Sequence, residues 1–213
     1  MIYRQISKIV LQILPGSDLR YLLLHKSPDR LAPRLVTPNC ELVIDGFPRS
    51  ANTWIYYHVQ VAFPETRIAH HVHSWQQFLL ARFYRVPSIL IVRNPDACVQ
   101  SLATKRGGVL MLHYLDYLMT TGFGALFANK VYLFDKVTGE HGIDDLIRNV
   151  AEIIGKPASA PDPAQVKALM EERTENKNVK TPPFQKEVLG PVSKVSRRIA
   201  KCLYKRLKGR LSS

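Results

Sequence analysis

A short polar run between two apolar segments holds the residues best suited to bind an anion. Arg49 supplies a fixed charge on a planar fork of donors, and Ser50, Asn52 and Thr53 supply short polar side chains. Apolar residues before the run predict a buried strand over residues 41–45, and the pattern after it predicts a helix. A loop between a strand and a helix N-terminus offers unpaired N–H groups and the positive end of the helix dipole. The stretch predicts an anion-binding loop, with an ordinary helix N-terminus after a turn as the alternative.

This loop differs from the phosphate-binding loop of nucleotide kinases. The kinase motif is glycine-rich and ends in Gly-Lys-Ser/Thr, whose hydroxyl holds magnesium. Here the loop has no Lys, and Ala51 stands where a Gly is expected. A kinase that transfers phosphate is therefore disfavoured.

A second anion-binding candidate follows a predicted strand over residues 88–92. Arg93 comes directly after this strand, and Ser101 lies on a helix predicted to begin at Pro95. A guanidinium pairs bidentately with a phosphate, and the Ser hydroxyl can bond a further oxygen. The alternative is an Arg paired with a nearby carboxylate and a helical Ser that faces solvent.

Three histidines, His70, His71 and His73, follow a short predicted strand over residues 67–69. Histidine suits the role of general base because its unperturbed pKa lies near neutral pH. The same cluster could bind a metal, but in a strand His71 and His73 share a face with no carboxylate or Cys at a matching spacing. A general base is favoured over a metal site, and a structural or surface cluster is the third reading.

Three phrases of the sequence together resemble the PAPS-dependent sulfotransferases, and in particular their bacterial-type branch; PAPS is 3′-phosphoadenosine 5′-phosphosulfate. Residues 47–54 resemble the family's 5′-phosphosulfate loop, residues 91–101 its 3′-phosphate element, and residues 70–73 the segment with its catalytic His. The resemblance covers residues 36–155. It implies a three-layer, P-loop NTPase-like α/β fold, and transfer of a sulfuryl group from PAPS to a hydroxyl or amine acceptor without a metal.

The resemblance also implies roles for individual residues. His71 aligns with the base, His73 is a second catalytic candidate, and Arg49 would stabilise charge on the transferring group. The residues implied to bind PAPS are Arg49, Ser50, Ala51, Asn52, Thr53, Trp54, Arg93 and Ser101.

The chain departs from the family pattern at three points. Arg49 stands where many members have Lys, and it cannot readily donate a proton. Ala51 replaces a Gly, so a methyl group is present where the backbone approaches the phosphosulfate. The late Arg-Lys-Gly cofactor element of cytosolic members is missing, and Arg197 or Arg198 is the candidate to take over its contacts.

Strands that alternate with helices predict how these groups are positioned. A fourth strand is expected over residues 130–134, and helices are expected over residues 143–154 and 162–175, with a last helix in the basic C-terminal segment. Ser74 and Gln77 have the spacing of a capping box at the start of another helix. This order favours a parallel sheet covered by helices on both faces, with ligands beyond the carboxyl ends of the strands.

A length of 213 residues suits a single domain. We expect residues 1–35 to form a helical lead-in, residues 36–155 the α/β core, and residues 156–213 a helical part with a basic tail. Variable segments at 105–127 and 176–191 are the candidates for the acceptor pocket. A sugar, a glycolipid or another small molecule is the expected acceptor. The apolar candidates for pocket lining, which would serve equally as core, are Leu110, His113, Tyr114 and Tyr117.

The net charge of +13 is concentrated near the C-terminus. Removing the eight basic residues between Lys194 and Arg210 leaves +5, and no acidic residue lies among them. This tail fits an anionic ligand, a membrane surface or nucleic acid, but no nucleic-acid motif accompanies it. The alternative to an enzyme is therefore a non-catalytic nucleotide-binding or membrane-surface-associated α/β protein.

Cysteine usage and hydropathy bear on the compartment. Cys40, Cys98 and Cys202 are widely spaced without a metal-ligand pattern, which favours buried thiols in a reducing compartment. No apolar run approaches the roughly 18 residues of a membrane span, and no secretory signal is recognised. We expect a cytoplasmic protein, with peripheral contact at the inner face of the membrane as an open option.

Overall fold

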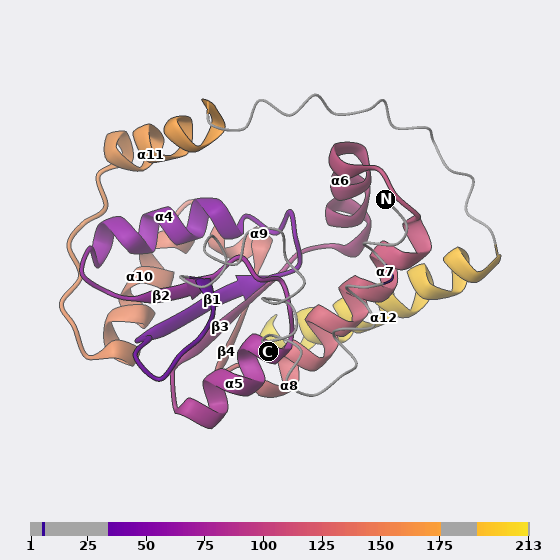
Figure 1. Cartoon of the computed structure of the whole chain (residues 1–213), viewed down its shortest axis with the longest axis horizontal. Coiled ribbons are helices and arrows are strands. Elements are labelled where there is room, and N and C mark those ends of the chain that lie inside the picture. Colours follow the sequence, from indigo (N-terminus) through magenta and orange to yellow (C-terminus); the bar gives the residue numbers. More distant parts are fainter. Residues whose placement is uncertain (1–5, 7–33, 176–190, 213) are drawn as a thin grey trace.

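The structure is a computed structural model that describes Ile6, residues 34–175 and residues 191–212 (Figure 1). Most of the helical lead-in expected over residues 1–35 lies outside these ranges, as does most of segment 176–191. Within the described ranges, no helix combines the length and the apolar character needed to cross a membrane.

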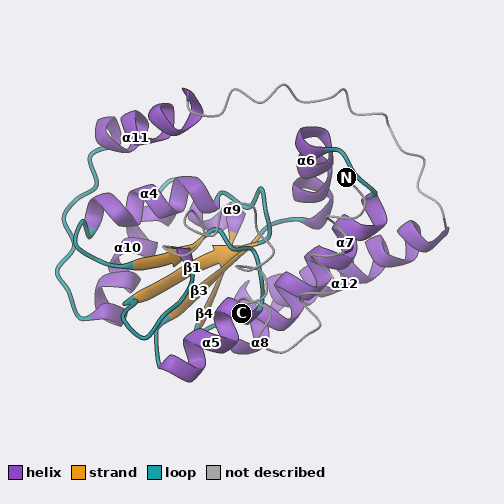
Figure 2. Ribbon diagram, in the orientation of Figure 1, coloured by secondary structure: helices purple, strands orange, loops and turns teal. Residues whose placement is uncertain are grey.

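Four parallel strands form the central sheet, in the order β2-β1-β3-β4. Their bounds are β1 Leu42–Gly46, β2 Ile68–His70, β3 Ser88–Val92 and β4 Lys130–Leu133. Figure 2 shows the strands side by side with helices on both faces. The predicted α/β class with a parallel sheet is confirmed, and each strand lies within a residue or so of its predicted position.

Alternate residues of the central strands pack on opposite faces of the sheet. Leu42 and Ile44 contact the cluster formed by helices α4 (Asn52–Ala62) and α10 (Gly142–Ile154). Val43 packs on the other face, with α5 (Gln76–Tyr84) and Tyr204 of α12 (Pro191–Ser212). Because the side-chain period of a strand is two, each central strand is buried on both sides, which gives three layers.

A third cluster of buried residues lies among the helices that follow β3. Helices α6 (Pro95–Arg106) and α7 (Leu110–Leu118) pack together with α12 (Figure 1). A π-helical turn η2 (Met119–Phe123) and α8 (Gly124–Phe127) lead from α7 to β4. Two further helices belong to the described part of the fold: α9 (Phe134–Val137) after β4, and α11 (Pro163–Glu175), which packs on α4.

The apolar residues considered for an acceptor pocket belong to this third cluster. Leu110, Tyr114 and Tyr117 are buried within it. His113 is also buried, and its Nε2 lies 2.9 Å from the Gly107 carbonyl. These four side chains serve as core.

The capping box predicted at Ser74 is not formed. Helix α5 begins at Gln76, and its N-cap residue Trp75 forms no side-chain cap hydrogen bond. The Ser74 hydroxyl accepts from the N–H of Gln76, at 3.3 Å, and not from that of Gln77. The Gln77 amide is fully buried, where its Oε1 accepts from the N–H of Val36 at 2.9 Å and its Nε2 donates to the carbonyl of Arg34 at 3.0 Å. Gln77 therefore satisfies backbone groups of the chain before β1, a tertiary role that outweighs local capping.

Candidate functional site

The loop after β1 is held in shape by Gly46 and Asn52. A Cβ at Gly46 would lie 2.3 Å from the Ile91 carbonyl oxygen of the neighbouring strand, so only Gly fits there. The buried Asn52 amide donates to the Gly46 carbonyl at 3.0 Å and to the Phe47 carbonyl at 3.1 Å. Asn52 thus fixes the loop through its side chain, which is a different contribution from the cofactor contact expected of it.

The N-terminus of α4 carries uncapped backbone donors. Ala51 is the N-cap residue, no side chain caps the helix, and the first turn has no acidic residue. The first N–H groups of a helix have no acceptor within it, and an Ala cannot supply one. Beside them, the Ser50 hydroxyl is buried and has no hydrogen-bond partner among the described residues. Donors without acceptors around one loop suit an anionic ligand.

Ala51 adopts a left-handed backbone conformation, with φ 60° and ψ 14°. The Ala51 methyl group is therefore present at a strained position. We expect Ala51→Gly to raise the free energy of unfolding by about 0.5–1 kcal/mol, because relief of roughly 1–2 kcal/mol of strain exceeds the entropy that Gly adds to the unfolded chain. Urea unfolding measures the effect. The matched control, Ala168→Gly within α11, should lower the same free energy by up to about 1 kcal/mol, and a loss at both positions would refute the strain.

Arg49, Arg93 and Ser101 meet beyond the ends of β1 and β3. Arg49 Nε donates to Ser101 Oγ at 2.8 Å, and an Arg93 Nη donates to the Arg49 carbonyl at 2.7 Å. Strand β2 lies on one side of β1 and β3 lies on the other side, so the connections leave in opposite directions there. The region beyond the ends of β1 and β3 is therefore the switch point of the sheet. Ligands of open parallel sheets bind at such a point, and the two predicted motifs are brought together there.

Neither guanidinium in this group forms an ion pair with a carboxylate in the part of the chain that the structure describes. Arg93 lies over the Phe134 ring, with 4.1 Å from its guanidinium carbon to the ring centroid. The Tyr117 hydroxyl donates to the Arg93 carbonyl at 2.9 Å and fixes the backbone there. The alternative in which Arg93 pairs with a nearby carboxylate therefore does not hold among these residues, and the charge of both cations is available to a ligand.

His71 and His73 lie beside the same loop, beyond the end of β2. Both have left-handed backbone conformations, with φ 60° and 59°, so they do not continue the strand as the metal argument assumed. His71 Nε2 lies 2.9 Å from the hydroxyl of Thr53, and the His71 and His73 ring centroids are 5.7 Å apart. Strained conformations of this kind cluster at functional sites. No group of three or more potential metal ligands occurs among the described residues.

A buried carboxylate holds His73 in place. Asp45 is fully buried at the end of β1, and its two oxygens accept from the N–H groups of Gly46, Val72 and His73 at 2.8–2.9 Å. His73 Nδ1 lies 3.0 Å from Asp45 Oδ1 and 2.7 Å from the Gly46 carbonyl. Two acceptors lie closest to Nδ1, while Asn52 Nδ2, 3.3 Å away, already donates to the carbonyls of Gly46 and Phe47. We therefore assign the proton to Nδ1, which leaves Nε2 as the acceptor nitrogen.

Asp45 is ionised in this arrangement. Burial alone would raise its pKa, but the electrostatic interaction with the His73 imidazole and the hydrogen bonds from His73 and Gly46 outweigh burial and lower it. The sequence predicts Asp45 only as the end of a strand. The signal available was an acidic residue closing an otherwise apolar buried strand, where a carboxylate requires partners.

Arg197 is bound to Asp96 rather than directed at the Arg49–Arg93 group. Its guanidinium donates to both oxygens of Asp96, at 2.9 and 2.6 Å, and Lys201 lies 2.8 Å from the same carboxylate. The Tyr114 hydroxyl also donates to Asp96, at 2.8 Å. These contacts tie α12 to α6 and α7.

We expect Asp96→Asn to lower the free energy of unfolding by about 1–2 kcal/mol at neutral pH, since it removes a partly exposed ionic cluster. Partial burial opposes ionisation, but hydrogen bonds from Arg197, Lys201 and Tyr114 lower the pKa of Asp96 overall. Because the pKa of Asp96 is lower in the folded state, its ionised carboxylate stabilises the folded protein at any pH above the unfolded pKa of about 3.9. This stabilisation is lost as the pH falls through the pKa of the folded state. The wild-type advantage should therefore shrink below about pH 4 in urea unfolding.

The control for this prediction is Asp145→Asn. Asp145 forms an exposed pair with Arg148, at 3.2 Å and one helical turn away, and such pairs contribute less than about 1 kcal/mol. A loss at Asp96 no larger than the loss at Asp145, or one that does not depend on pH, would contradict the stabilising role of the Asp96 cluster.

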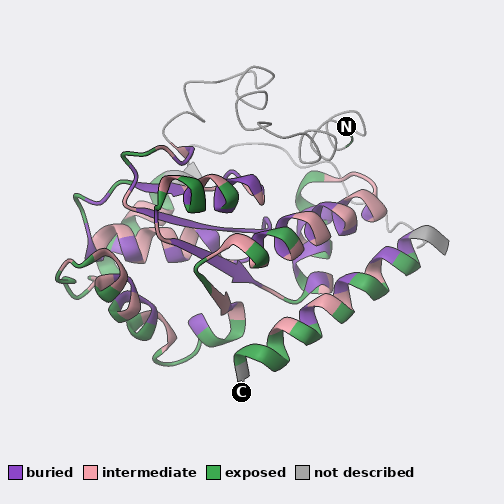
Figure 3. Cartoon of the chain, turned by 90° about the horizontal axis from the view of Figure 1, so that it is seen from below, coloured by how far each residue is buried: buried purple, intermediate pink, exposed green. Residues whose placement is uncertain are grey.

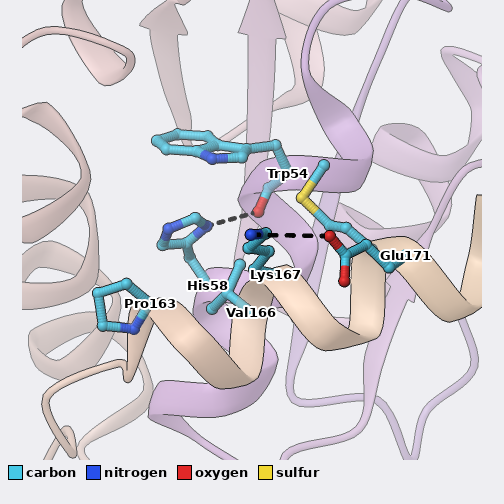
Figure 4. A pocket seen from close by; sticks show the side chains of 7 residues that line it. Trp54, His58, Pro163, Val166, Lys167 and Glu171 are labelled. Atoms are coloured by element: carbon cyan, nitrogen blue, oxygen red, sulfur yellow. Dashed lines mark hydrogen bonds and ion pairs between the residues drawn. The ribbon is translucent and has the colours of Figure 1, made fainter.

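A pocket of about 490 Å³ opens between α4 and α11 (Figure 4). Trp54 and His58 line it from α4, with ring centroids 4.2 Å apart, and α11 contributes the opposite wall. Its size lies in the range of small-molecule sites. Trp54 thus joins the anion-binding loop to a pocket with an aromatic wall. The residues from α11 are Pro163, Val166, Lys167, Met170 and Glu171.

Comparison with family models and curated proteins identifies no relative of this chain. No family model matches the chain, and a search of curated proteins gave no match either.

Proposed function

We propose that this protein is a PAPS-dependent sulfotransferase that moves a sulfuryl group to a hydroxyl or amine acceptor. The observation that carries the proposal is the meeting of Arg49, Arg93 and Ser101 at the switch point of a parallel sheet, with no carboxylate paired to either guanidinium among the described residues. Two uncompensated cations and a hydroxyl at this place suit a ligand with several negative charges.

The donor set fits the two anionic ends of PAPS. In the proposal, Arg49, Ser50 and the backbone N–H groups of Ala51, Asn52, Thr53 and Trp54 hold the 5′-phosphosulfate. Arg93 and Ser101 hold the 3′-phosphate, which a guanidinium can bind bidentately. The pocket beside Trp54 offers an aromatic wall and apolar side chains to the adenine base.

PAPS would supply an activated sulfuryl group, and the chain's own residues would handle the proton and the charge. The acceptor hydroxyl loses its proton to a histidine, a role worth on the order of 10²–10⁴-fold in rate. We assign this role to His73, because Asp45 holds its Nδ1–H and leaves Nε2 as the nitrogen that would accept the proton. His71, which the resemblance implies as the base, is the competing assignment; its Nε2 faces Thr53.

Arg49 and the N-terminus of α4 would neutralise charge that develops on the transferring sulfuryl group and the leaving phosphate. Preorganised donors of this kind typically contribute about 10²–10³-fold each. Arg49 is already fixed by its bond to Ser101, and its carbonyl is fixed by Arg93, so little reorganisation is needed. Arg49 would act by charge and hydrogen bonding only, since a guanidinium does not donate its proton at neutral pH.

The proposal is tested by incubating the protein with PAPS that carries radiolabelled sulfate and with a panel of alkyl glycosides, long-chain alcohols and amines. We expect label in at least one acceptor, with stoichiometric release of adenosine 3′,5′-bisphosphate. If the protein binds the bisphosphate but labels no acceptor and releases no product, it is a non-catalytic nucleotide-binding protein.

A further inference from the structure

Helix α12 has two different faces. One face, which packs mainly on α7, is lined by small or aromatic side chains that are buried. The buried residues of that face are Ser193, Ser196, Ala200 and Tyr204. The opposite face is exposed along its length, as the green segments of α12 in Figure 3 show.

The exposed face carries an apolar strip. Val195 and Ile199 are one turn apart and are 55% and 52% exposed, and the exposed Cys202 continues the strip on the next turn. Branched aliphatic side chains do not favour a helix, and here they contribute nothing to the core. Exposed apolar side chains that lie in a row, rather than singly, are typical of a surface that binds a partner.

Basic residues surround this strip. Helix α12 has no acidic residue, while Arg197 and Lys201 are used within the protein to bind Asp96. The remaining basic side chains between 194 and 210 are all exposed, and all are long enough to extend beside the apolar strip. They are Lys194, Arg198, Lys205, Arg206, Lys208 and Arg210.

We propose that the exposed face of α12 lies on an anionic lipid membrane. An interfacial helix buries a narrow apolar face at the boundary between headgroups and acyl chains, and its Lys and Arg side chains bind lipid phosphates. The strip of Val195, Ile199 and Cys202 between cations has this form. The inference goes beyond the proposed sulfotransferase activity and does not depend on it.

Charge argues against other occupants of this face. If a second copy of the protein bound here, two α12 helices with eight basic residues each would face one another and repel. Residues 1–33 carry five basic and two acidic residues, and residues 176–190 carry three basic and one acidic, so both segments have the same sign as α12. A nucleic acid would match the charge but not the aliphatic strip, because the aromatic Tyr204 is on the buried face and offers no surface for base stacking.

Binding to the membrane would also fix the orientation of the proposed site. Asp96 ties α12 to α6 through Arg197 and Lys201, and α6 carries Ser101. The site at the switch point therefore keeps a constant position relative to the lipid surface.

The test is co-sedimentation of the full-length protein with vesicles of phosphatidylcholine, alone or mixed with phosphatidylglycerol. We expect binding to the anionic vesicles only, weakened by salt. Arg198→Gln/Lys205→Gln should weaken it roughly 10- to 30-fold, because each basic side chain near an anionic surface contributes several-fold. The matched control, Lys136→Gln/Arg148→Gln, removes the same charge from exposed positions on α9 and α10 and should leave most of the binding.

A second variant separates the apolar contribution from charge. Val195→Ser/Ile199→Ser keeps every charge and should weaken vesicle binding at least several-fold; circular dichroism should show a folded protein, since both side chains are exposed. Absence of vesicle binding, equal binding to neutral vesicles, or equal loss in the control would overturn the proposal. Preferential binding to duplex DNA or RNA over the anionic vesicles would overturn it in favour of nucleic acid.

Discussion

His73→Ala is expected to lower kcat for sulfuryl transfer by about 10²–10⁴-fold, while the affinity for adenosine 3′,5′-bisphosphate changes little. The substitution removes the basic nitrogen that would accept the acceptor's proton, but it leaves Arg49, Arg93 and Ser101 in place. Two measurements are made on the same preparation: initial rates with the best acceptor of the panel, and titration with the bisphosphate. A fall in kcat without a change in bisphosphate affinity would assign His73 to the chemical step.

His71→Ala is the matched control, because both residues have left-handed backbones beside the same loop. We expect a smaller loss of kcat for His71→Ala. The reverse order would assign the base to His71, as the family resemblance implies, and would contradict the role given to Asp45.

Asp45 is expected to act as a positioning residue, through His73. In Asp45→Asn one acceptor oxygen becomes an NH₂ donor, so kcat should fall with little change in KM for PAPS. A readout specific to positioning is the ¹⁵N spectrum of the imidazole: wild-type His73 should carry its proton on Nδ1, and Asp45→Asn should shift it toward Nε2. An unchanged tautomer would show that Asp45 has only a structural role.

Arg93→Ala is expected to weaken binding of adenosine 3′,5′-bisphosphate roughly 30- to 1,000-fold, from the loss of about 2–4 kcal/mol of charge-assisted hydrogen bonding. Affinity for adenosine 5′-monophosphate should change much less, because that nucleotide lacks the 3′-phosphate. Arg93→Lys should fall between wild type and Ala, since a Lys keeps the charge but loses the planar fork. Isothermal titration of each variant measures the effect.

Arg148→Ala is the control for Arg93. Arg148 is exposed on α10 and pairs with Asp145, away from the switch point. Bisphosphate affinity that falls equally in both variants would indicate a general effect of net charge. An Arg93→Ala protein with wild-type affinity would remove the 3′-phosphate role from Arg93.

The sheet and the loops that carry Arg49 and Arg93 were predictable from the sequence because their signals are local. β3 has the predicted bounds, since Pro87 precedes an unbroken apolar run and Arg93-Asn94-Pro95 follows it. Asn94 caps α6 by accepting from two backbone N–H groups, and Gly155 ends α10 in a left-handed conformation. Parallel strands place their carboxyl ends at one edge, so the approach of Arg49 to Arg93 follows from the order of elements.

Other features depend on contacts between distant segments. The role of Asp45 depends on His73, 28 residues later in the chain, and Gln77 bonds to backbone 41 residues earlier. Periodicity indicates that Leu110, Tyr114 and Tyr117 share a helix face, but it does not reveal whether that face lines a pocket or packs on α12. Local pattern therefore predicted the polar loop after β1, but not the carboxylate that contacts His73.

The central claim is that the switch point binds a nucleotide with a 3′-phosphate. The most direct measurement is isothermal titration of the wild-type protein with adenosine 3′,5′-bisphosphate, beside adenosine 5′-monophosphate and ATP with magnesium. We expect the bisphosphate to bind at least about 30-fold more tightly than the monophosphate, because its 3′-phosphate would contact Arg93 and Ser101. Equal affinities for the two nucleotides, or tight binding of ATP with magnesium alone, would contradict the assignment of Arg93 and Ser101 and, with it, a PAPS site.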